Sequence, residues 1–162
     1  MPELATKDAC ELLDADHIAV KHLFVDYARL AIAPDADATL SERTALAMKI
    51  CDELTVHAQI EEEIFYPALR DALPETDPLV EEAAAEHAEA KQLIADIRGI
   101  GTANPAMDTL VAELNVAIEH HVKEERDELF PKAKATPALD LKELGEALKN
   151  RQRELEQAAA TA

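Results

Sequence analysis

A tetrad of the form His-x-x-x-Glu occurs twice in this chain, from His57 to Glu61 and from His121 to Glu125, and a proline follows each glutamate after six residues. Residues four apart lie on one face of a helix, one turn from each other. Each tetrad therefore predicts a helix that presents an imidazole and a carboxylate in the same direction. Because the pattern recurs, we expect the two helices to be matching parts of one structure.

A second repeated pair precedes the tetrads. Asp16-His17 is echoed by Glu86-His87, so each half of the chain contains a histidine followed by His-x-x-x-Glu. Imidazole and carboxylate groups doubled in this way are the donor set of a site for two metal ions in a helical bundle. The candidate metal ligands are His17, His57, Glu61, His87, His121 and Glu125.

The composition favours helices throughout. Ala, Leu, Glu and Lys dominate the 162 residues, 3% are aromatic and only three are glycine. No stretch shows the alternation of a strand, so the predicted fold class is all-α. The length suits a single core, which we divide into a metal-binding bundle over residues 1–136 and a helical extension over residues 137–162.

Helix punctuation predicts four long helices and a fifth. The first runs from about residue 8 to residue 33 and stops near Pro34. The segment from Thr39 to Glu42 has the pattern of a capping box, and it opens a second helix that continues to about Tyr66. Pro67 and its counterpart Pro131 are expected to kink or end their helices just beyond the site.

The second half repeats these signals. Asp77-Pro78 predicts an N-cap followed by proline at the first helical position, and Gly99 and Gly101 end that helix. Asn104-Pro105 opens a fourth helix that runs to about residue 133. A fifth, amphipathic helix is predicted over residues 138–157. Short connections make neighbouring helices antiparallel, as in an up-down-up-down four-helix bundle.

Heptad spacing identifies the inward face of each long helix. All six candidate ligands lie on these faces, and a buried carboxylate costs several kcal/mol unless it is paired or binds a metal. The pattern therefore favours a metal site over core histidines that merely bond to carboxylates. The predicted inward residues are Leu13, His17, Val20, Phe24, Tyr27 and Ala31; Ala47, Ile50, Leu54, His57, Glu61, Ile64 and Ala68; Val80, Ala83, His87, Ala90, Ile94 and Ile97; and Val111, Leu114, Ile118, His121 and Glu125.

Five further polar residues receive weaker assignments. His22 and His120 are expected on the surface or beside the ligands, because their positions in the repeat do not match. Glu62 is either solvated or an extra ligand. Tyr27 and Tyr66 are either packing residues or phenols close to the metals, and both alternatives stay open.

Charge and hydropathy exclude some partners. A net charge of −18 argues against nucleic acid and anionic membrane surfaces, which require basic patches. No segment has the roughly 20 apolar residues of a membrane span. Cys10 and Cys51 lie far apart in no metal-type spacing, so we expect reduced thiols and a cytoplasmic protein.

Over about residues 8–134 the motifs resemble those of the hemerythrin-like, or HHE cation-binding, domains. The resemblance implies a non-haem di-iron centre, in which two iron ions are bridged by two carboxylates and an oxo or hydroxo group. Manganese and zinc are alternative metals. The matching residues are His17 in the first helix, His57 and Glu61 in the second, His87 in the third, and His121 and Glu125 in the fourth.

The resemblance also bears on function. Oxygen-carrying members have an additional histidine where this chain has Lys91, which implies an open coordination position here. That favours a protein that reacts with peroxide or dioxygen, with catalase-like disproportionation as the enzymatic form and oxidative stress as the setting. Two alternatives stay open: a non-catalytic sensor or binding module for oxygen, nitric oxide or iron, and a structural bundle with a zinc or degenerate site.

The oligomeric state is open between a monomer and a homodimer. The C-terminal segment carries a stripe of leucines that either packs across the bundle or forms a dimer contact. These residues are Leu141, Leu144, Leu148 and Leu155.

Overall fold

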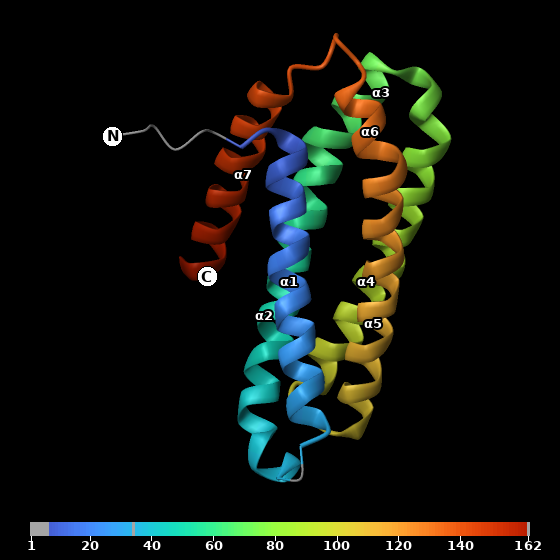
Figure 1. Cartoon of the computed structure of the whole chain (residues 1–162). Coiled ribbons are helices and arrows are strands. Elements are labelled where there is room, and N and C mark those ends of the chain that lie inside the picture. The colour runs from blue at the N-terminus through green and yellow to red at the C-terminus, as the bar shows by residue number, and fades with distance from the viewer. Residues whose placement is uncertain (1–6, 34, 162) are drawn as a thin grey trace.

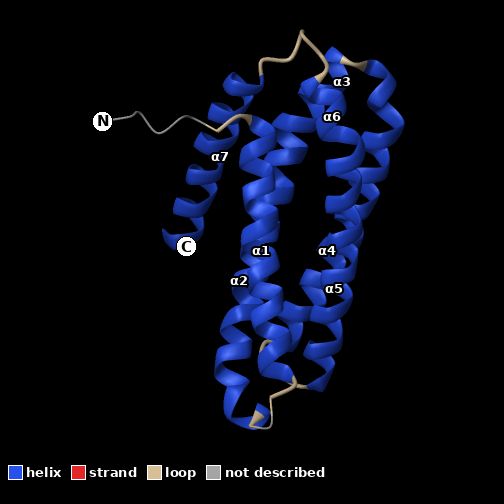
Figure 2. Cartoon of the chain, viewed as in Figure 1, coloured by secondary structure: helices blue, strands red, loops and turns tan. Residues whose placement is uncertain are grey.

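Four long helices form an up-down-up-down bundle in the computed structural model, which describes residues 7–33 and 35–161 (Figure 1). They are α1 (Ala9–Ala31), α2 (Leu40–Ile60), α4 (Asp77–Ile100) and α5 (Pro105–Glu124). Each packs against two others, in the order α1, α2, α4, α5 and back to α1, so the bundle is closed. Figure 2 shows helices and loops but no strand in the described part, which confirms the predicted all-α bundle.

Shorter elements join the long helices, and a further helix, α7 (Leu141–Thr161), lies beside the N-terminal half of α1 (Figure 1). Two of the short elements are single turns of π-helix, and both begin at a glutamate of a His-x-x-x-Glu tetrad. The short elements are the 3₁₀ turns η1 (Ala36–Thr39) and η3 (Pro74–Thr76), the π-turns η2 (Glu61–Phe65) and η4 (Glu125–Leu129), and the helices α3 (Tyr66–Ala72) and α6 (Phe130–Lys134).

Two predicted helix starts are confirmed by their caps. Oδ1 of Asp8 accepts the backbone N–H of Glu11 at 2.9 Å and caps α1. Oδ1 of Asn104 accepts the N–H of Met107 at 2.8 Å and caps α5, with proline at the next position as expected. The predicted stop near Pro34 lies outside the described residues.

Two other predicted starts are wrong in detail. Thr39 makes no side-chain cap, because its hydroxyl donates to the carbonyl of Ala36 at 2.7 Å and so closes η1 instead. Asp77 is the first helical residue of α4 rather than its N-cap, because the 3₁₀ turn η3 leads straight into the helix. At the other end of α4, Gly101 alone adopts a left-handed conformation, with φ of 75°, and Gly99 remains within the helix.

The π-turns change the register of the inward face. Proline lacks a backbone N–H and clashes with the carbonyl four residues earlier, so Pro67 and Pro131 are poorly suited to a regular α-helix. In each case the preceding residue instead bonds five residues back, as the N–H of Tyr66 does to the carbonyl of Glu61. The wider turn inserts one residue and lets the helix continue. The predicted inward positions Ile64 and Ala68 are therefore only half-buried, and their successors Phe65 and Leu69 are buried instead.

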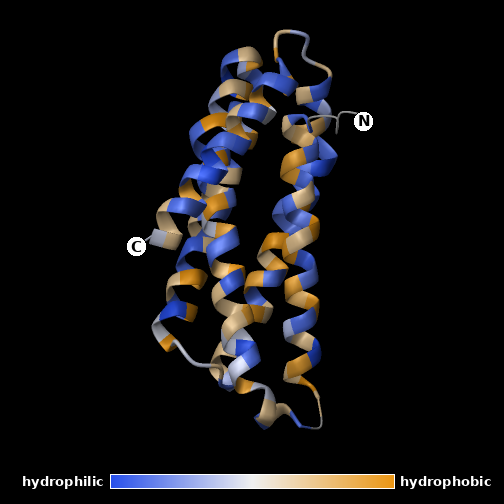
Figure 3. Ribbon diagram, turned by 90° about the vertical axis from the view of Figure 1, so that its left-hand side faces the viewer, coloured by the Kyte–Doolittle hydropathy of each residue, from blue (hydrophilic) through white to orange (hydrophobic). Residues whose placement is uncertain are grey.

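The core consists of two apolar clusters separated by a polar layer. One cluster lies at the end where α3, α6 and α7 pack, and includes Leu13, Phe65 and Leu148. The other lies toward the far end of the bundle and includes Phe24 and Leu114. The amphipathic patterning that builds them is visible as mixed orange and blue along each helix in Figure 3.

The leucines of α7 contact the bundle itself. Leu148 is fully buried, and its neighbours on the stripe pack against the first cluster. Within the chain the stripe therefore packs across the bundle. Within the described residues no helix combines the length and apolarity needed to cross a membrane.

Candidate metal centre

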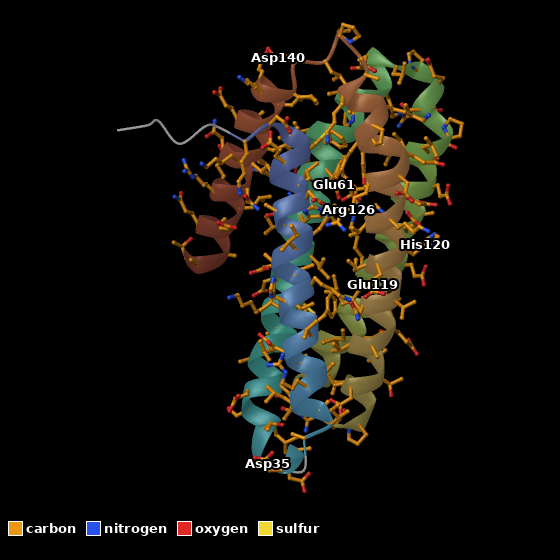
Figure 4. The ribbon with its side chains drawn as sticks, in the orientation of Figure 1. Asp35, Glu61, Glu119, His120, Arg126 and Asp140 are labelled. Carbon is orange, nitrogen blue, oxygen red and sulfur yellow. The ribbon has the colours of Figure 1, made fainter. Side chains whose placement is uncertain are left out.

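All six candidate ligands lie in the polar layer between the two apolar clusters. The four histidines are 4–7% exposed, and the two glutamates are completely buried. Figure 4 shows Glu61 inside the bundle, whereas His120 lies at the outer side of α5. The contributing elements are α1 for His17, α2 and its π-turn for His57 and Glu61, α4 for His87, and α5 and its π-turn for His121 and Glu125.

The six residues fall into two triads, each with donor atoms close enough to hold one metal ion. His17, His57 and Glu125 form one triad, and Glu61, His87 and His121 form the other. Within each triad the donor atoms lie within 4.8 Å of one another. A metal with two imidazoles and a carboxylate in each triad would match the preferences of iron, manganese or zinc.

Glu61 and Glu125 lie between the triads rather than at their outer edges. Oε1 of Glu61 is 3.0 Å from Nε2 of His57 in the first triad and 3.4 Å from Nε2 of His87 in the second. Oε1 of Glu125 is 2.6 Å from Nε2 of His121 and 3.5 Å from Nε2 of His17. Each carboxylate therefore faces histidines of both triads, as a bridging ligand would.

Each histidine also has a carboxylate on the outer side of its ring. With Nε2 directed toward the buried glutamates, Nδ1 of His17, His57 and His121 lies within hydrogen-bond distance of a second acid, which fixes the ring orientation as outer partners of metal-binding histidines do. Nδ1 of His87 has no hydrogen-bond partner among the described residues. The Nδ1-to-oxygen distances are 3.2 Å for His17 and Asp14, 3.1 Å for His57 and Asp16, 2.9 Å for His121 and Glu86, and 3.7 Å for His87 and Glu62.

These outer acids were not predicted, although the sequence contains a signal for two of them. Asp16 and Glu86 immediately precede His17 and His87 in the repeated dipeptide. Each supports not its neighbour but the histidine of the next long helix in its half, Asp16 supporting His57. The repeated acid therefore indicated the outer partners of the site, just as the repeated histidine indicated its candidate ligands.

The buried carboxylates strongly perturb the imidazoles. Burial by itself would lower the pKa of His57, but Glu61 and Asp16 outweigh it and raise the pKa to about 10. For His121, burial is likewise outweighed by Glu125, and the pKa rises to about 12. In the absence of a cation these carboxylates hold protons on the imidazoles that a metal ion would replace.

Several buried atoms in the layer make no well-aligned hydrogen bond among the described residues, although the ion-pair contacts above bring some of them as close as 2.6 Å. They include Nε2 of His17 and His57, Oε1 of Glu61, and both carboxylate oxygens of Glu125. Unsatisfied polar atoms are rare in a core because each costs about 1–3 kcal/mol. These five belong to the predicted donor set, so the residues present fit a pair of cations.

The two tyrosines have different surroundings. Tyr66 is buried, and its hydroxyl donates to Oε2 of Glu61 at 3.1 Å and lies 3.3 Å from Nε2 of His121. Tyr27 lies elsewhere, and its hydroxyl donates to Oδ1 of Asp108 at 2.7 Å. Of the two phenols that the sequence left open, the structure therefore brings only Tyr66 to the site.

Lys91 and Glu62 form a pair beside His87. Nζ of Lys91 donates to both carboxylate oxygens of Glu62, at 2.7 and 2.9 Å. Because Glu62 faces Nδ1 of His87, it lies behind the ring and not among the inward-facing donors. The structure thus gives Lys91 a role in holding an outer acid.

The residues expected at the periphery lie there. His22 is exposed, and the side chain of His120 is 64% exposed, with Nε2 3.1 Å from Oε2 of Glu86. Glu124 is near the same acid, and burial, followed by hydrogen bonding to Glu86, raises the pKa of Glu124 to about 7.

Three cavities meet at His17. A small one of about 20 Å³ lies against all four histidines and is walled by apolar side chains such as Leu54 and Ile118. A pocket of about 480 Å³ between α1, α2 and α7 reaches His17 and His57. Another of about 560 Å³ between α1 and α5 also ends at His17.

Known proteins show the same domain. The sequence model of the hemerythrin HHE cation binding domain matches residues 8–133. The crystal structure of a hemerythrin HHE cation binding domain-containing protein from Mycobacterium kansasii, an Rv2633c homolog, superimposes with a TM-score of 0.74 at 27% identity, covering 96% of this chain and 91% of that one. A DNA nickase of Nostoc sp. is 34% identical over 82 residues, which are 51% of this chain but only 23% of the nickase.

Proposed function

Because this chain belongs to the hemerythrin HHE cation-binding family, we propose that its six buried donors hold two iron ions, which react with hydrogen peroxide in a catalase-like disproportionation. The observation that carries the proposal is the position of Glu61 and Glu125 between two histidine triads. Shared carboxylates would hold two ions close together. When bound, such a pair supplies the two-electron redox capacity that the reaction needs.

The substrate size follows from the cavity beside the histidines. Its volume of about 20 Å³ exceeds the roughly 10–15 Å³ that one water molecule requires. Hydrogen peroxide, with two heavy atoms, is therefore a suitable occupant of this cavity, whereas a bulky alkyl peroxide would fit only the larger pockets that end at His17. Leu54, Ile94 and Ile118 give this cavity largely apolar walls.

The hydroxyl of Tyr66 can act as a hydrogen-bond donor at the edge of the site. The hydroxyl of Tyr66 lies within hydrogen-bond distance of Oε2 of Glu61 and of Nε2 of His121. Burial first, and then Glu125 and Glu61, raise the pKa of Tyr66 well above its usual value, so the phenol stays protonated. The neutral hydroxyl of Tyr66 can therefore donate its proton from Oη in a hydrogen bond to a neighbouring oxygen atom.

The test combines metal analysis with oxygen evolution. We expect two irons per chain when iron is supplied during expression, and one molecule of oxygen for every two of hydrogen peroxide consumed, with cumene hydroperoxide almost unreacted. Glu61→Ala should lose both metal and turnover, and the exposed His22→Ala should lose neither. One metal or none per wild-type chain, or full loading without repeated turnover, would contradict the proposal.

A second candidate is a binding or sensing module for dioxygen or nitric oxide. The small size and apolar walls of the same cavity favour it, since both gases are diatomic. A stable, reversible adduct with either gas, together with no peroxide turnover, would select this function. Lys91→His, which places an imidazole one turn after His87, should slow peroxide turnover and prolong an oxygen adduct.

The remaining assignments are proposals of the same kind. Cys10 and Cys51 are both free and buried, which is consistent with a reducing compartment, and we place the protein in the cytoplasm. We propose a monomer, because the leucine stripe of α7 is already used within the chain. DNA nicking is not carried over, because a net charge of −18 disfavours phosphate backbones.

A further inference from the structure

The helix α7 reaches the metal centre through one side chain. Nε2 of Gln152 donates to Oδ1 and Oδ2 of Asp16 at 3.3 and 3.1 Å. Oδ2 of Asp16 in turn lies 3.1 Å from Nδ1 of His57. A chain of hydrogen bonds therefore runs from α7 through α1 to a histidine of α2. Residue 152 lies beyond the 8–133 segment that the family model matches.

Neighbouring contacts hold Gln152 in this place. One residue before it, Arg151 donates from Nε to Oε2 of Glu63 at 2.8 Å and from Nη2 to Oε1 at 3.3 Å, which ties α7 to the π-turn that begins at Glu61. One turn earlier, Leu148 is fully buried in the first apolar cluster. Gln152 is therefore positioned by packing on one side and by an ion pair on the other.

In the part of the chain that the structure describes, the second half of the site lacks such a donor. There Glu86 supports His121, and Oε2 of Glu86 lies 3.1 Å from Nε2 of His120 of α5 but makes no hydrogen bond within the described residues. In the first half the carboxylate of Asp16 takes its outer donor from α7 instead. The two halves thus share a metal-site histidine with a supporting acid, but within the described residues the hydrogen bond on the outer side of the acid is made in the first half, by a helix outside the four-helix bundle.

We propose that Gln152 is a positioning residue for the metal centre, holding Asp16 so that it orients His57, and that metal retention therefore depends on the docking of α7. The inference rests on the proposed metal binding but not on any redox activity. Because linkage is reciprocal, bound metal also favours the docked position of α7.

The donor itself can be tested with an isosteric change. Gln152→Glu keeps the size of the side chain but replaces the donating amide with a carboxylate beside Asp16, and Gln152→Ala removes the side chain. Gln157→Ala is the matched control, since Gln157 is an exposed glutamine of the same helix. The readout is the rate at which ferrous iron leaves the anaerobic full-length protein for a colorimetric chelator.

Loss of an acid that directly supports a metal-bound histidine costs about 10- to 100-fold in affinity, so an effect transmitted through Asp16 should be smaller. We expect release about fivefold faster in both Gln152 variants and unchanged in Gln157→Ala. In an Asp16→Ala background, Gln152→Ala should add nothing. Circular dichroism and melting of the metal-free proteins check that the variants are folded.

Two outcomes would overturn the inference. Gln152 variants that release iron as slowly as Gln157→Ala would show that the contact has no effect on the site. An effect of Gln152→Ala that persists in full without Asp16 would show that it acts by another route. A wild-type protein that holds no iron at all would instead contradict the metal centre, and this inference with it.

Discussion

Tyr66 and Glu61 are joined twice across one turn of π-helix. The backbone N–H of Tyr66 bonds to the carbonyl of Glu61, and the phenol donates to Oε2 of the same residue at 3.1 Å. In a regular α-helix a residue five positions on would point elsewhere, because each residue rotates by about 100°. The turn that accommodates Pro67 therefore also aims the phenol at the metal centre.

Replacement of Tyr66 by phenylalanine should affect chemistry more than stability. The ring still fills its place, so the loss of one hydrogen bond should cost about 1 kcal/mol of unfolding free energy. Without the phenolic proton, peroxide turnover should fall about 100-fold at unchanged metal content. Tyr27→Phe is the control, because Tyr27 bonds to Asp108 away from the site. Equal turnover in the two variants would show that the Tyr66 hydroxyl takes no part.

Loss of either buried carboxylate should lower occupancy at both metal positions. Glu61 and Glu125 each face histidines of both triads, so Glu61→Ala or Glu125→Ala removes a donor from two sites at once. By contrast, His17→Ala removes a donor from one triad only. Elemental analysis of metal per chain would measure the difference. If Glu125→Ala still holds one full equivalent, that carboxylate is not shared.

The stabilising effect of metal should increase with pH. In the metal-free protein the pKa of His57 is raised from 6.5 to about 10, and that of His121 to about 12. The stability that these raised pKa values contribute is fully present below pH 6.5 and is lost as pH rises through 10. Metal replaces the same protons, so its binding is favoured as they become easier to remove.

The measurement for this prediction is the difference in melting temperature between metal-loaded and metal-free protein at pH 6.5 and at pH 9. We expect the difference to be larger at pH 9, chiefly because the metal-free protein becomes less stable. A difference that stays constant over this range would mean that metal binding does not displace protons from His57 and His121.

Gly145→Ala should release α7 from the bundle. A Cβ atom at this position would lie 2.5 Å from the carbonyl oxygen of Lys7 and 2.9 Å from the carbonyl carbon of Asp8, both of which are backbone atoms. Such overpacking typically costs about 1–3 kcal/mol. We expect a lower melting temperature and faster proteolysis within α7.

Gly99→Ala provides the opposite control. An added Cβ there meets nothing within 4 Å, and the residue is helical. Alanine should therefore stabilise α4 by up to about 1 kcal/mol through its higher helix propensity. If both glycine variants changed stability in the same direction, the close approach of α7 to the start of α1 would not be the cause.

The sequence was sufficient to predict the bundle and the layer because both depend on side-chain periodicity. His17, His87 and the apolar residues around them lie inside as their spacing requires. That these residues bind metal, and that the chain divides at residue 136, remain predictions. After Glu61 the heptad spacing no longer predicts which residues are buried. Burial shifts there from Ile64 to Phe65, because a π-turn inserts one residue. The recurring proline was the local cause, but a proline alone does not distinguish a kink from a π-turn.

Contacts between residues far apart in the sequence were harder to predict. Thr39 has the pattern of an N-cap, yet its hydroxyl donates to Ala36 and accepts a bond from the buried Arg43, whose guanidinium pairs with Asp108 of α5 at 2.6 Å. The bond from Gln152 to Asp16 joins residues 136 positions apart. Neither contact follows from local helix propensity, because the packing of the helices determines which of these residues meet.

The two apolar clusters at the ends of the bundle could hold the chain folded before it binds a metal ion. The first cluster joins α1, α2 and α4 to η4 and α6, which continue α5, and the second joins α1, α2, α4 and α5 themselves. We therefore expect the metal-free protein to be folded, so that cations could load the proposed centre after folding.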